Sequence, residues 1–237
     1  MMLEIENATK NFGSVIAVND VSLKVERGDL IGVMGPNGAG KTTLLSLIDG
    51  TNPLSSGRIS FFNQNITGHG AAFCARSGIG RTFQIPKPFE HMSVYENVLV
   101  SAIYAGGQST GQAHDTALQV LDFTKLSDRG NQISGGLTLL QRKRLELARA
   151  LSGRPKLLLL DEIAAGLTDL ELAELLDVVR QISGNGMTII WIEHVVHALT
   201  SLANRLIVID FGSKIADGPT EEVINSDAVK QVYLGVD

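Results

Sequence analysis

The chain has 237 residues, a single cysteine and no long apolar run. The lone Cys74 excludes an intrachain disulfide and a metal site built on several thiolates, and it fits a reducing compartment. The longest apolar segments, PKLLLL and MTIIWIE, are strand-sized, far below the roughly 18 residues of a membrane-spanning helix. The first residues, MMLEIENATKNFG, include charges and lack an apolar core, so we expect no secretory signal. Any membrane contact is therefore expected to come through a partner.

The charge balance is slightly acidic, with a formal net charge of -5. This balance argues against broad, non-specific binding of nucleic acid. Hydrophobic residues make up 44% of the chain and charged residues 19%, as in ordinary globular proteins. The length suffices for one large domain, or for one domain with a sizeable inserted lobe.

Short apolar runs alternate along the chain with segments of helical periodicity. The runs are LIGVMG at 30–35, KLLLLDE at 156–162, TIIWIEH at 188–194 and LIVIDFGSKIADG at 206–218, the last with a turn at Phe211-Gly212. Continuous apolar strands joined by helices predict a mostly parallel, buried sheet. The N-terminal segments LEIENATKNFG, VSLKVERGD and GRISFFNQNI alternate more and predict an antiparallel flank. The expected fold class is therefore α/β.

The middle of the chain, from about 90 to 150, lacks strand runs. SVYENVLVSAIYAG and TALQVLDFTKL have helical spacing, and the stretch GGQSTGQ at 106–112 between them predicts a loop. We predict one domain over 1–237, in which a helical lobe at about 91–151 is inserted into a core lobe at about 1–90 and 152–237.

The segment GPNGAGKT fits the phosphate-loop pattern G-x-x-x-x-G-K-[ST]. It follows an apolar strand and opens a helix, so its backbone N–H groups and the helix N-terminus would face an anion. Lys41 would reach the outer phosphates of a ligand, and Thr42 would ligate Mg²⁺. The other interpretation, a glycine-rich hairpin turn, is disfavoured by the flanking strand and helix. The candidate nucleotide-binding residues here are Gly35, Pro36, Asn37, Gly38, Ala39, Gly40, Lys41, Thr42 and Thr43.

A pair of carboxylates, Asp161 and Glu162, stands at the end of the strand LLLLDE, where α/β sheets bind ligands. Asp161 would hold Mg²⁺ directly or through water, and Glu162 would activate the attacking water as a general base. Taken alone, the pair is equally compatible with two solvated acids at a strand end. The positions of Gln84 and His194 in the sequence do not by themselves indicate a functional role for either residue.

The order of these motifs resembles that of the ATP-binding subunits of ABC transporters, and the resemblance covers nearly the whole chain. The order runs from an aromatic near the start, Phe12, through the phosphate loop, RTFQ with Gln84, a helical lobe, RLELARAL and LLLLDE to IEH with His194. The segments VSLKVERGDLIGVMGPNGAGKTTL, GIGRTFQIPKPFEHMSVYENV, DEIAAGL and VKQVYLG are similar to ATPases of branched-chain amino-acid importers.

The resemblance implies roles for three residues that the spacing leaves open. Phe12 would stack on the adenine of ATP, and His194 would contact the γ-phosphate and join Lys41 and Glu162 in catalysis. Gln84 would sense Mg²⁺ and the attacking water, beside the groove that receives the membrane subunit. Two such subunits would close around two ATP molecules. Each ATP would be held by the phosphate loop of one subunit and the signature segment of the other.

The resemblance also implies the partners of the chain. They would be multispanning permease subunits, a second ATPase subunit in a homodimer or heterodimer, and indirectly a periplasmic or extracellular solute-binding protein, with no nucleic acid. The chain would lie peripherally on the cytoplasmic face of the cell membrane. A rival hypothesis is a soluble ABC ATPase acting on nucleic acid or ribosomes, although such proteins usually carry coiled-coil insertions or tandem ATPase domains. Glu162 and His194 argue against a third, a non-hydrolysing regulatory module.

The signature segment departs from the family pattern Leu-Ser-Gly-Gly-Gln and admits two registers. Ser134-Gly135-Gly136 has the right residue types but lies about four residues too far from the arginine-rich helix. The register Leu137–Gln141 needs no gap and keeps the capping-box form S/T-x-x-E/Q, which predicts a helix start at Thr138. We favour this second register. Leu139 and Leu140 then replace glycines and would crowd a phosphate, which indicates a degenerate signature. An asymmetric heterodimer would accommodate such a signature.

Two further features concern the neighbouring segments. Thr168 stands where such importers commonly have an asparagine, in the loop after Glu162. Arg142 and Lys143 lie four and three residues before Glu146, so surface ion pairs would account for these cations in the first turn of the helix as well as a docked phosphate would.

Overall fold

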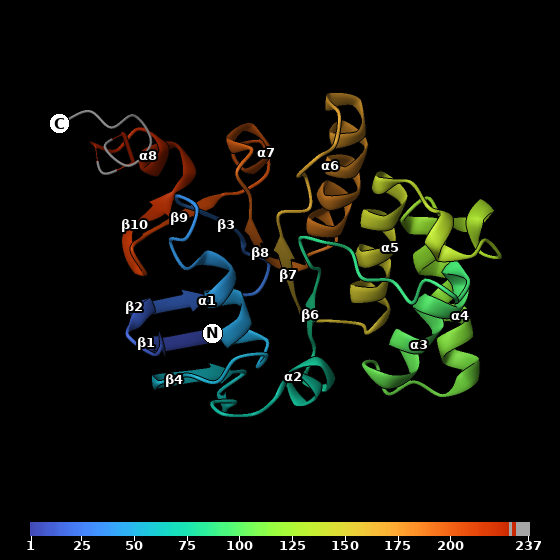
Figure 1. Ribbon diagram of the computed structural model, residues 1–237, viewed down its shortest axis with the longest axis horizontal. Coiled ribbons are helices and arrows are strands. Elements are labelled where there is room, and N and C mark those ends of the chain that lie inside the picture. The colour runs from blue at the N-terminus through green and yellow to red at the C-terminus, as the bar shows by residue number, and fades with distance from the viewer. Residues whose placement is uncertain (228, 231–237) are drawn as a thin grey trace. The chain divides into compact units, whose positions relative to one another are not determined.

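The computed structural model describes residues 1–227 and 229–230 (Figure 1). The chain forms two compact units. Unit 1 holds Met1–Cys74 with the described residues from Gly186 onward, and unit 2 holds Ala75–Asn185. The predicted helical lobe, about 91–151, falls within unit 2, and its boundaries remain a prediction. Of the similar ending VKQVYLG, the residues from 231 on lie outside the described part.

Unit 1 contains the predicted antiparallel flank. Its four strands, in the order β2-β1-β4-β5, are β1 (Leu3–Phe12), β2 (Val15–Val25), β4 (Ser56–Phe61) and β5 (Gln64–Asn65). Along the first half of β1, Leu3 and Ile5 are buried while Glu6 is exposed. This period of two arises because successive side chains of a strand point to opposite faces of the sheet.

Unit 1 also contains a largely parallel sheet in the order β10-β9-β3-β8. The strands are β3 (Leu30–Met34), β8 (Thr188–Ile192), β9 (Arg205–Asp210) and β10 (Ser213–Pro219). β3 is parallel to both β8 and β9, and all its residues are buried, as the continuous apolar run predicts. The helices are α1 (Lys41–Ile48), α7 (Val196–Thr200) and α8 (Thr220–Ile224), and α2 (Ala71–Ser77) follows β5 along the chain.

Unit 2 combines two parallel strands with helices. The strands are β6 (Ile79–Arg81) and β7 (Leu157–Asp161), and α6 (Asp169–Gly184) follows β7 along the chain. Three helices, α3 (Val94–Tyr104), α4 (Thr110–Phe123) and α5 (Leu139–Ser152), contact one another (Figure 1). Their shared core includes Val94, Val98, Leu121 and Leu145, each at most 2% exposed. This packing holds the start of α5 in place.

The loop predicted at 106–112 is shorter than expected. Helix α4 already begins at Thr110, because Ser109 and Gln112 form a capping box in which the Ser109 N–H donates to Gln112 Oε1 at 3.2 Å. The glycines and the serine of GGQSTGQ are typical of a loop, so the sequence pattern did not indicate this helix start. The turn predicted at Phe211-Gly212 is confirmed, with both residues at positive φ between β9 and β10.

Candidate functional site

The predicted phosphate loop connects β3 to α1 in unit 1. Lys41, the first residue of α1, is 5% exposed, and its ammonium donates to the carbonyls of Gly35 at 2.7 Å and Pro36 at 2.8 Å. The loop therefore curls around the lysine. An anion at the start of the helix would meet this ammonium together with the first backbone N–H groups of α1.

Two glycines make this curl possible. Gly35 and Gly40 have φ of 151° and 102°, in the region that favours glycine. A Cβ atom at Gly35 would lie 2.0 Å from the carbonyl oxygen of Ile209, and one at Gly40 would lie 2.1 Å from that of Ala17. The backbones of strands β9 and β2 therefore lie directly against the loop backbone and leave no space for a side chain at these two positions.

Among the other predicted residues of unit 1, Ala39 is buried, whereas Thr42, Phe12 and His194 are exposed. Thr42 is exposed and Thr43 half-buried in the first turn of α1. Phe12 is 48% exposed at the end of β1, with the Lys10 ammonium 4.9 Å from its ring centroid. His194 is exposed just after β8, whose carboxyl end shares a sheet edge with the carboxyl end of β3.

In unit 2 the carboxylate pair ends strand β7. Asp161 is 1% and Glu162 is 7% exposed, so the alternative of two solvated acids is wrong. Arg81, at the end of the neighbouring strand β6, pairs with Asp161 at 2.9 Å, and the Gln84 amide donates to the Glu162 carboxylate. Glu162 has a φ of 48°, a strained conformation of the kind that gathers at functional sites.

Two buried cations beside this pair were missed in the sequence. Arg81 neutralises Asp161, and Lys143 of α5 is 3% exposed and donates to the Glu162 carbonyl at 3.3 Å. The alternative of surface ion pairs around Glu146 is wrong, because Lys143 and Glu146 are both buried. Glu146 instead accepts from Arg149 at 2.7 Å and from the Lys87 N–H at 2.8 Å. Buried charges of this kind need partners that sequence spacing does not reveal.

The segment Ser134-Gly135-Gly136 forms a 3-10 turn and has a structural role. Ser134 is fully buried, and its hydroxyl donates to the Phe89 carbonyl at 2.9 Å while accepting from the Asn97 amide at 3.3 Å. Arg142 donates to the Gly135 carbonyl at 2.6 Å. With its hydroxyl engaged and without access to solvent, Ser134 is not placed to contact a ligand.

Helix α5 begins as predicted, with Thr138 as its N-cap. The Thr138 N–H donates to Gln141 Oε1 at 3.0 Å, and the Gln141 N–H donates to Thr138 Oγ1 at 3.4 Å, which completes the capping box. Leu140 is only 8% exposed, whereas Leu139 is 41% exposed. Leu139 is therefore the side chain that would mainly crowd a ligand. A Cβ at Gly166 would lie 3.2 Å from Leu139 Cδ2, so Leu139 leans on the loop after Glu162.

Thr168, the departure in that loop, is the N-cap of α6. The Thr168 N–H donates to Glu171 Oε2 at 2.9 Å, and the Thr168 hydroxyl accepts from the Glu171 N–H at 3.4 Å. Hydrogen bonds from the Thr168 backbone and side chain lower the pKa of Glu171. Threonine is a favoured N-cap residue, although it ranks somewhat below asparagine, so the helix start tolerates the exchange.

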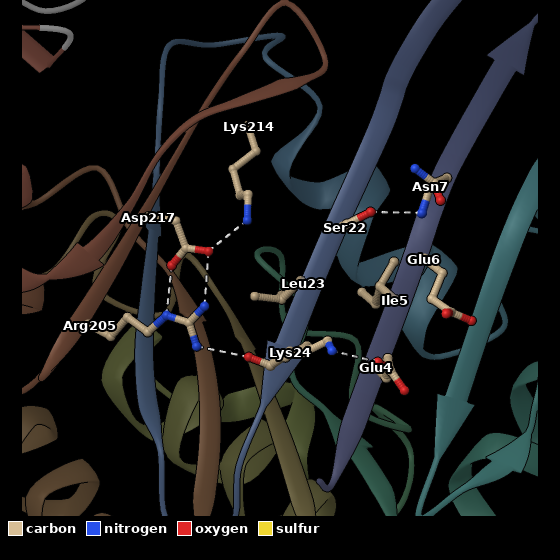
Figure 2. A pocket seen from close by; sticks show the side chains of 10 residues that line it. All are labelled: Glu4, Ile5, Glu6, Asn7, Ser22, Leu23, Lys24, Arg205, Lys214 and Asp217. Carbon is tan, nitrogen blue, oxygen red and sulfur yellow. Dashed lines mark hydrogen bonds and ion pairs between the residues drawn. The ribbon is translucent and has the colours of Figure 1, made fainter.

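A groove of about 470 Å³ lies elsewhere on unit 1, between strands β1 and β2 and the β9–β10 hairpin (Figure 2). Asp217 accepts from Arg205 at 2.7 and 2.9 Å and from Lys214 at 2.7 Å, and Arg205 also donates to the Lys24 carbonyl at 2.8 Å (Figure 2). Burial raises the pKa of Asp217, but these hydrogen bonds and charges outweigh burial and leave it below its ordinary value. The cluster therefore ties the hairpin to β2.

Within residues 1–227 and 229–230, every helix is too short or too polar to cross a bilayer.

Comparison with known proteins agrees with this arrangement. The family model described as ABC transporter matches residues 18–165. The high-affinity branched-chain amino acid transport ATP-binding protein BraF of Pseudomonas aeruginosa is 34% identical, over 99% of this chain and 98% of its own. The probable branched-chain amino acid transport ATP-binding protein LivG of Methanocaldococcus jannaschii is 33% identical, over 99% of this chain and 97% of its own.

Solved structures agree with the sequence comparison. A nucleotide-free ATP-binding cassette from an ABC transporter is 32% identical and superposes with a TM-score of 0.89, covering 99% of both chains. The ADP conformation of an ATP-binding cassette of an ABC transporter gives 0.88, also at 32% identity and 99% coverage of both chains. The expected α/β cassette fold is thereby confirmed. The chain belongs to the ABC transporter family and is an ATP-binding, ATP-hydrolysing subunit that powers such a transporter.

Proposed function

We propose that this ATPase drives the import of branched-chain or related amino acids. The observation that supports ATP-driven transport is the phosphate loop, which wraps around Lys41 at the start of α1. The cargo is inferred from the relatives, which are named as branched-chain amino acid transport proteins and match this chain over nearly its full length.

Mg²⁺ would be held by the Thr42 hydroxyl, the Gln84 amide oxygen and the Asp161 carboxylate. These are oxygen donors of the hard type that Mg²⁺ prefers, and a carboxylate and an amide supply them at the carboxyl ends of neighbouring strands in unit 2. When bound, the ion would neutralise charge on the β- and γ-phosphates. In the structure Arg81 forms an ion pair with Asp161 and compensates its charge.

The family resemblance supports a role toward ATP for each of the predicted residues. Phe12 would stack on adenine, Lys41 would hold the outer phosphates, and His194 would contact the γ-phosphate. Glu162 would accept the proton of the attacking water as general base. In the structure Gln84 holds the Glu162 carboxylate by a hydrogen bond, which supports a role in positioning this base.

A second ATPase subunit would complete each site through its signature segment. In this chain the first backbone N–H groups of α5, at Leu139 and Leu140, would face the partner's ATP. Leu139, with 41% of its surface exposed, would hinder close approach of the phosphate. We infer that this signature serves the partner's ATP weakly, which favours a heterodimer whose partner brings an intact signature.

The segment 83–89, which includes Gln84, would dock on the permease. Its side chains Phe83, Ile85 and Phe89 are 42%, 71% and 46% exposed. Exposed apolar residues clustered in one short segment mark interaction surfaces. A permease docked here would place the chain on the cytoplasmic face of the membrane, next to the glutamine that contacts Glu162.

Co-purification tests this assignment against the rival class. A tagged chain extracted from native membranes in mild detergent should retain multispanning subunits and a second ATPase. Ile85→Asp should release the membrane subunits while leaving ATP binding intact, because a charge in the apolar segment opposes docking. Tyr104→Asp, at a comparably exposed site (74%) in the same unit, is the matched control. Recovery of ribosomes or DNA in place of membrane subunits would contradict the proposal.

The signature assignment predicts different defects for two substitutions. Thr138→Ala removes the cap, and Ser134→Ala removes a buried hydroxyl, so each should destabilise the chain by about 1 kcal/mol. Only Thr138→Ala should also lower the ATPase rate of the assembled transporter, by roughly threefold to tenfold, because it displaces the N–H groups of the helix start. Rates are measured well below both melting temperatures. A lower rate in Ser134→Ala alone would overturn the assignment.

A further inference from the structure

Phe211 occupies a position that suits phenylalanine poorly. Its side chain is 89% exposed, more than any other large apolar side chain in the described part of the chain. Its backbone φ is 42°, in the left-handed region that glycine, asparagine and aspartate favour in such hairpin turns. Neither burial nor backbone preference therefore accounts for an aromatic residue here.

The turn that carries Phe211 is fixed to the phosphate loop. The N–H of Gly212 donates to the Ala39 carbonyl at 2.9 Å, and the carbonyl of Gly212 accepts from the Asn19 N–H at 2.8 Å. The Asn19 amide also donates to Ser213 Oγ at 3.3 Å. One residue of the turn thus links the phosphate loop to strand β2, and Phe211 precedes it directly.

The contacts also indicate which part of a bound nucleotide would lie near the turn. The end of the loop at Gly40 meets the Ala17 carbonyl of β2, and β2 begins at Val15, which pairs with Phe12. If the phosphates lie on the loop and adenine lies on Phe12, the sugar and base extend along this side of the loop. The turn borders the same side, since the Ala17 carbonyl oxygen is the nearest atom to a Cβ built at Gly212, at 3.1 Å, and Phe211 directly precedes Gly212.

We propose that Phe211 is a second aromatic contact for the base and ribose of the bound purine nucleotide, in addition to Phe12. This inference rests on the proposed placement of ATP on the phosphate loop. An exposed ring on a rigid turn offers a flat apolar face without the entropy loss of ordering a flexible segment. Its contribution concerns the nucleoside and leaves the phosphates to the loop.

Substitution by asparagine separates this role from a structural one. Phe211→Asn removes the ring but suits the left-handed turn, so the melting temperature should rise by about 1–3 °C. ATP affinity of the purified full chain, measured by titration calorimetry, should fall about threefold to tenfold. The affinity for inorganic tripolyphosphate, which has no nucleoside, should stay unchanged. Phe211→Tyr, which keeps the ring, should bind ATP like the parent chain.

Tyr104→Asn is the matched control, because Tyr104 is an aromatic that is 74% exposed on α3 of unit 2. It should leave the affinity for both ligands unchanged. The inference is overturned if Phe211→Asn binds ATP as tightly as the parent chain, or if both ligands weaken equally. Failure of the parent chain itself to bind ATP would overturn the proposed function and this inference with it.

Discussion

Glu162→Gln should lower the ATPase rate of the assembled transporter by about 10²- to 10⁴-fold while ATP still binds. The change replaces a carboxylate by an amide of the same shape, so the attacking water loses its proton acceptor. The side chain is 7% exposed and hydrogen-bonded to Gln84, a contact that the amide oxygen can still accept. ATP-bound dimers should accumulate because closure no longer ends in hydrolysis.

Two readouts distinguish this loss from a damaged fold. Steady-state phosphate release measures turnover, and size-exclusion chromatography with ATP measures the closed dimer. Glu221→Gln, an exposed glutamate in the first turn of α8, should behave like the parent chain in both. If Glu162→Gln retains more than about half of the turnover, Glu162 is not the general base.

Gly40→Ala should abolish measurable ATP binding. The new Cβ would lie 2.1 Å from the Ala17 carbonyl oxygen, and the φ of 102° is strained for any residue with a side chain. Backbone atoms of β2 cannot yield as a flexible side chain would, so the loop must leave the position that presents its N–H groups. We expect a loss of at least about 100-fold in ATP affinity, of the order that displacement of several charge-assisted hydrogen bonds produces.

Gly38→Ala separates the clash from the backbone preference. Gly38 has a φ of 79°, but a Cβ built there meets no atom within 4 Å. It should therefore suffer only the strain of the left-handed conformation, about 1 kcal/mol, and lose much less affinity. Titration calorimetry with ATP compares the two, and melting temperatures show that both variants fold. Equal losses in the two variants would contradict the steric account of Gly40.

Local patterns in the sequence predicted the parts of the site that local physics builds. The capping box at Thr138 and Gln141 lies within four residues, so the start of α5 was predictable from spacing alone. The glycine pattern of the phosphate loop and the apolar run before Asp161 are likewise local. Each was confirmed as backbone structure, while the roles of the side chains in catalysis remain proposals.

Contacts between distant segments were not predictable in this way. The Ser134 hydroxyl meets the Phe89 carbonyl 45 residues away, and Arg81 meets Asp161 80 residues away. Their pairing depends on which strands and helices become neighbours in the fold, and the hydrophobic periodicity of the sequence does not predict which ones do. The error at Glu146 has the same origin, because helical spacing alone does not show which face of α5 is buried.

Uptake of radiolabelled leucine by cells that carry Glu162→Gln in the chromosomal copy of this chain tests the central claim most directly. The account predicts uptake at the level of a strain lacking the chain, with Glu221→Gln cells at the parental level. Parental uptake in the Glu162→Gln strain would contradict the claim that hydrolysis by this chain powers import.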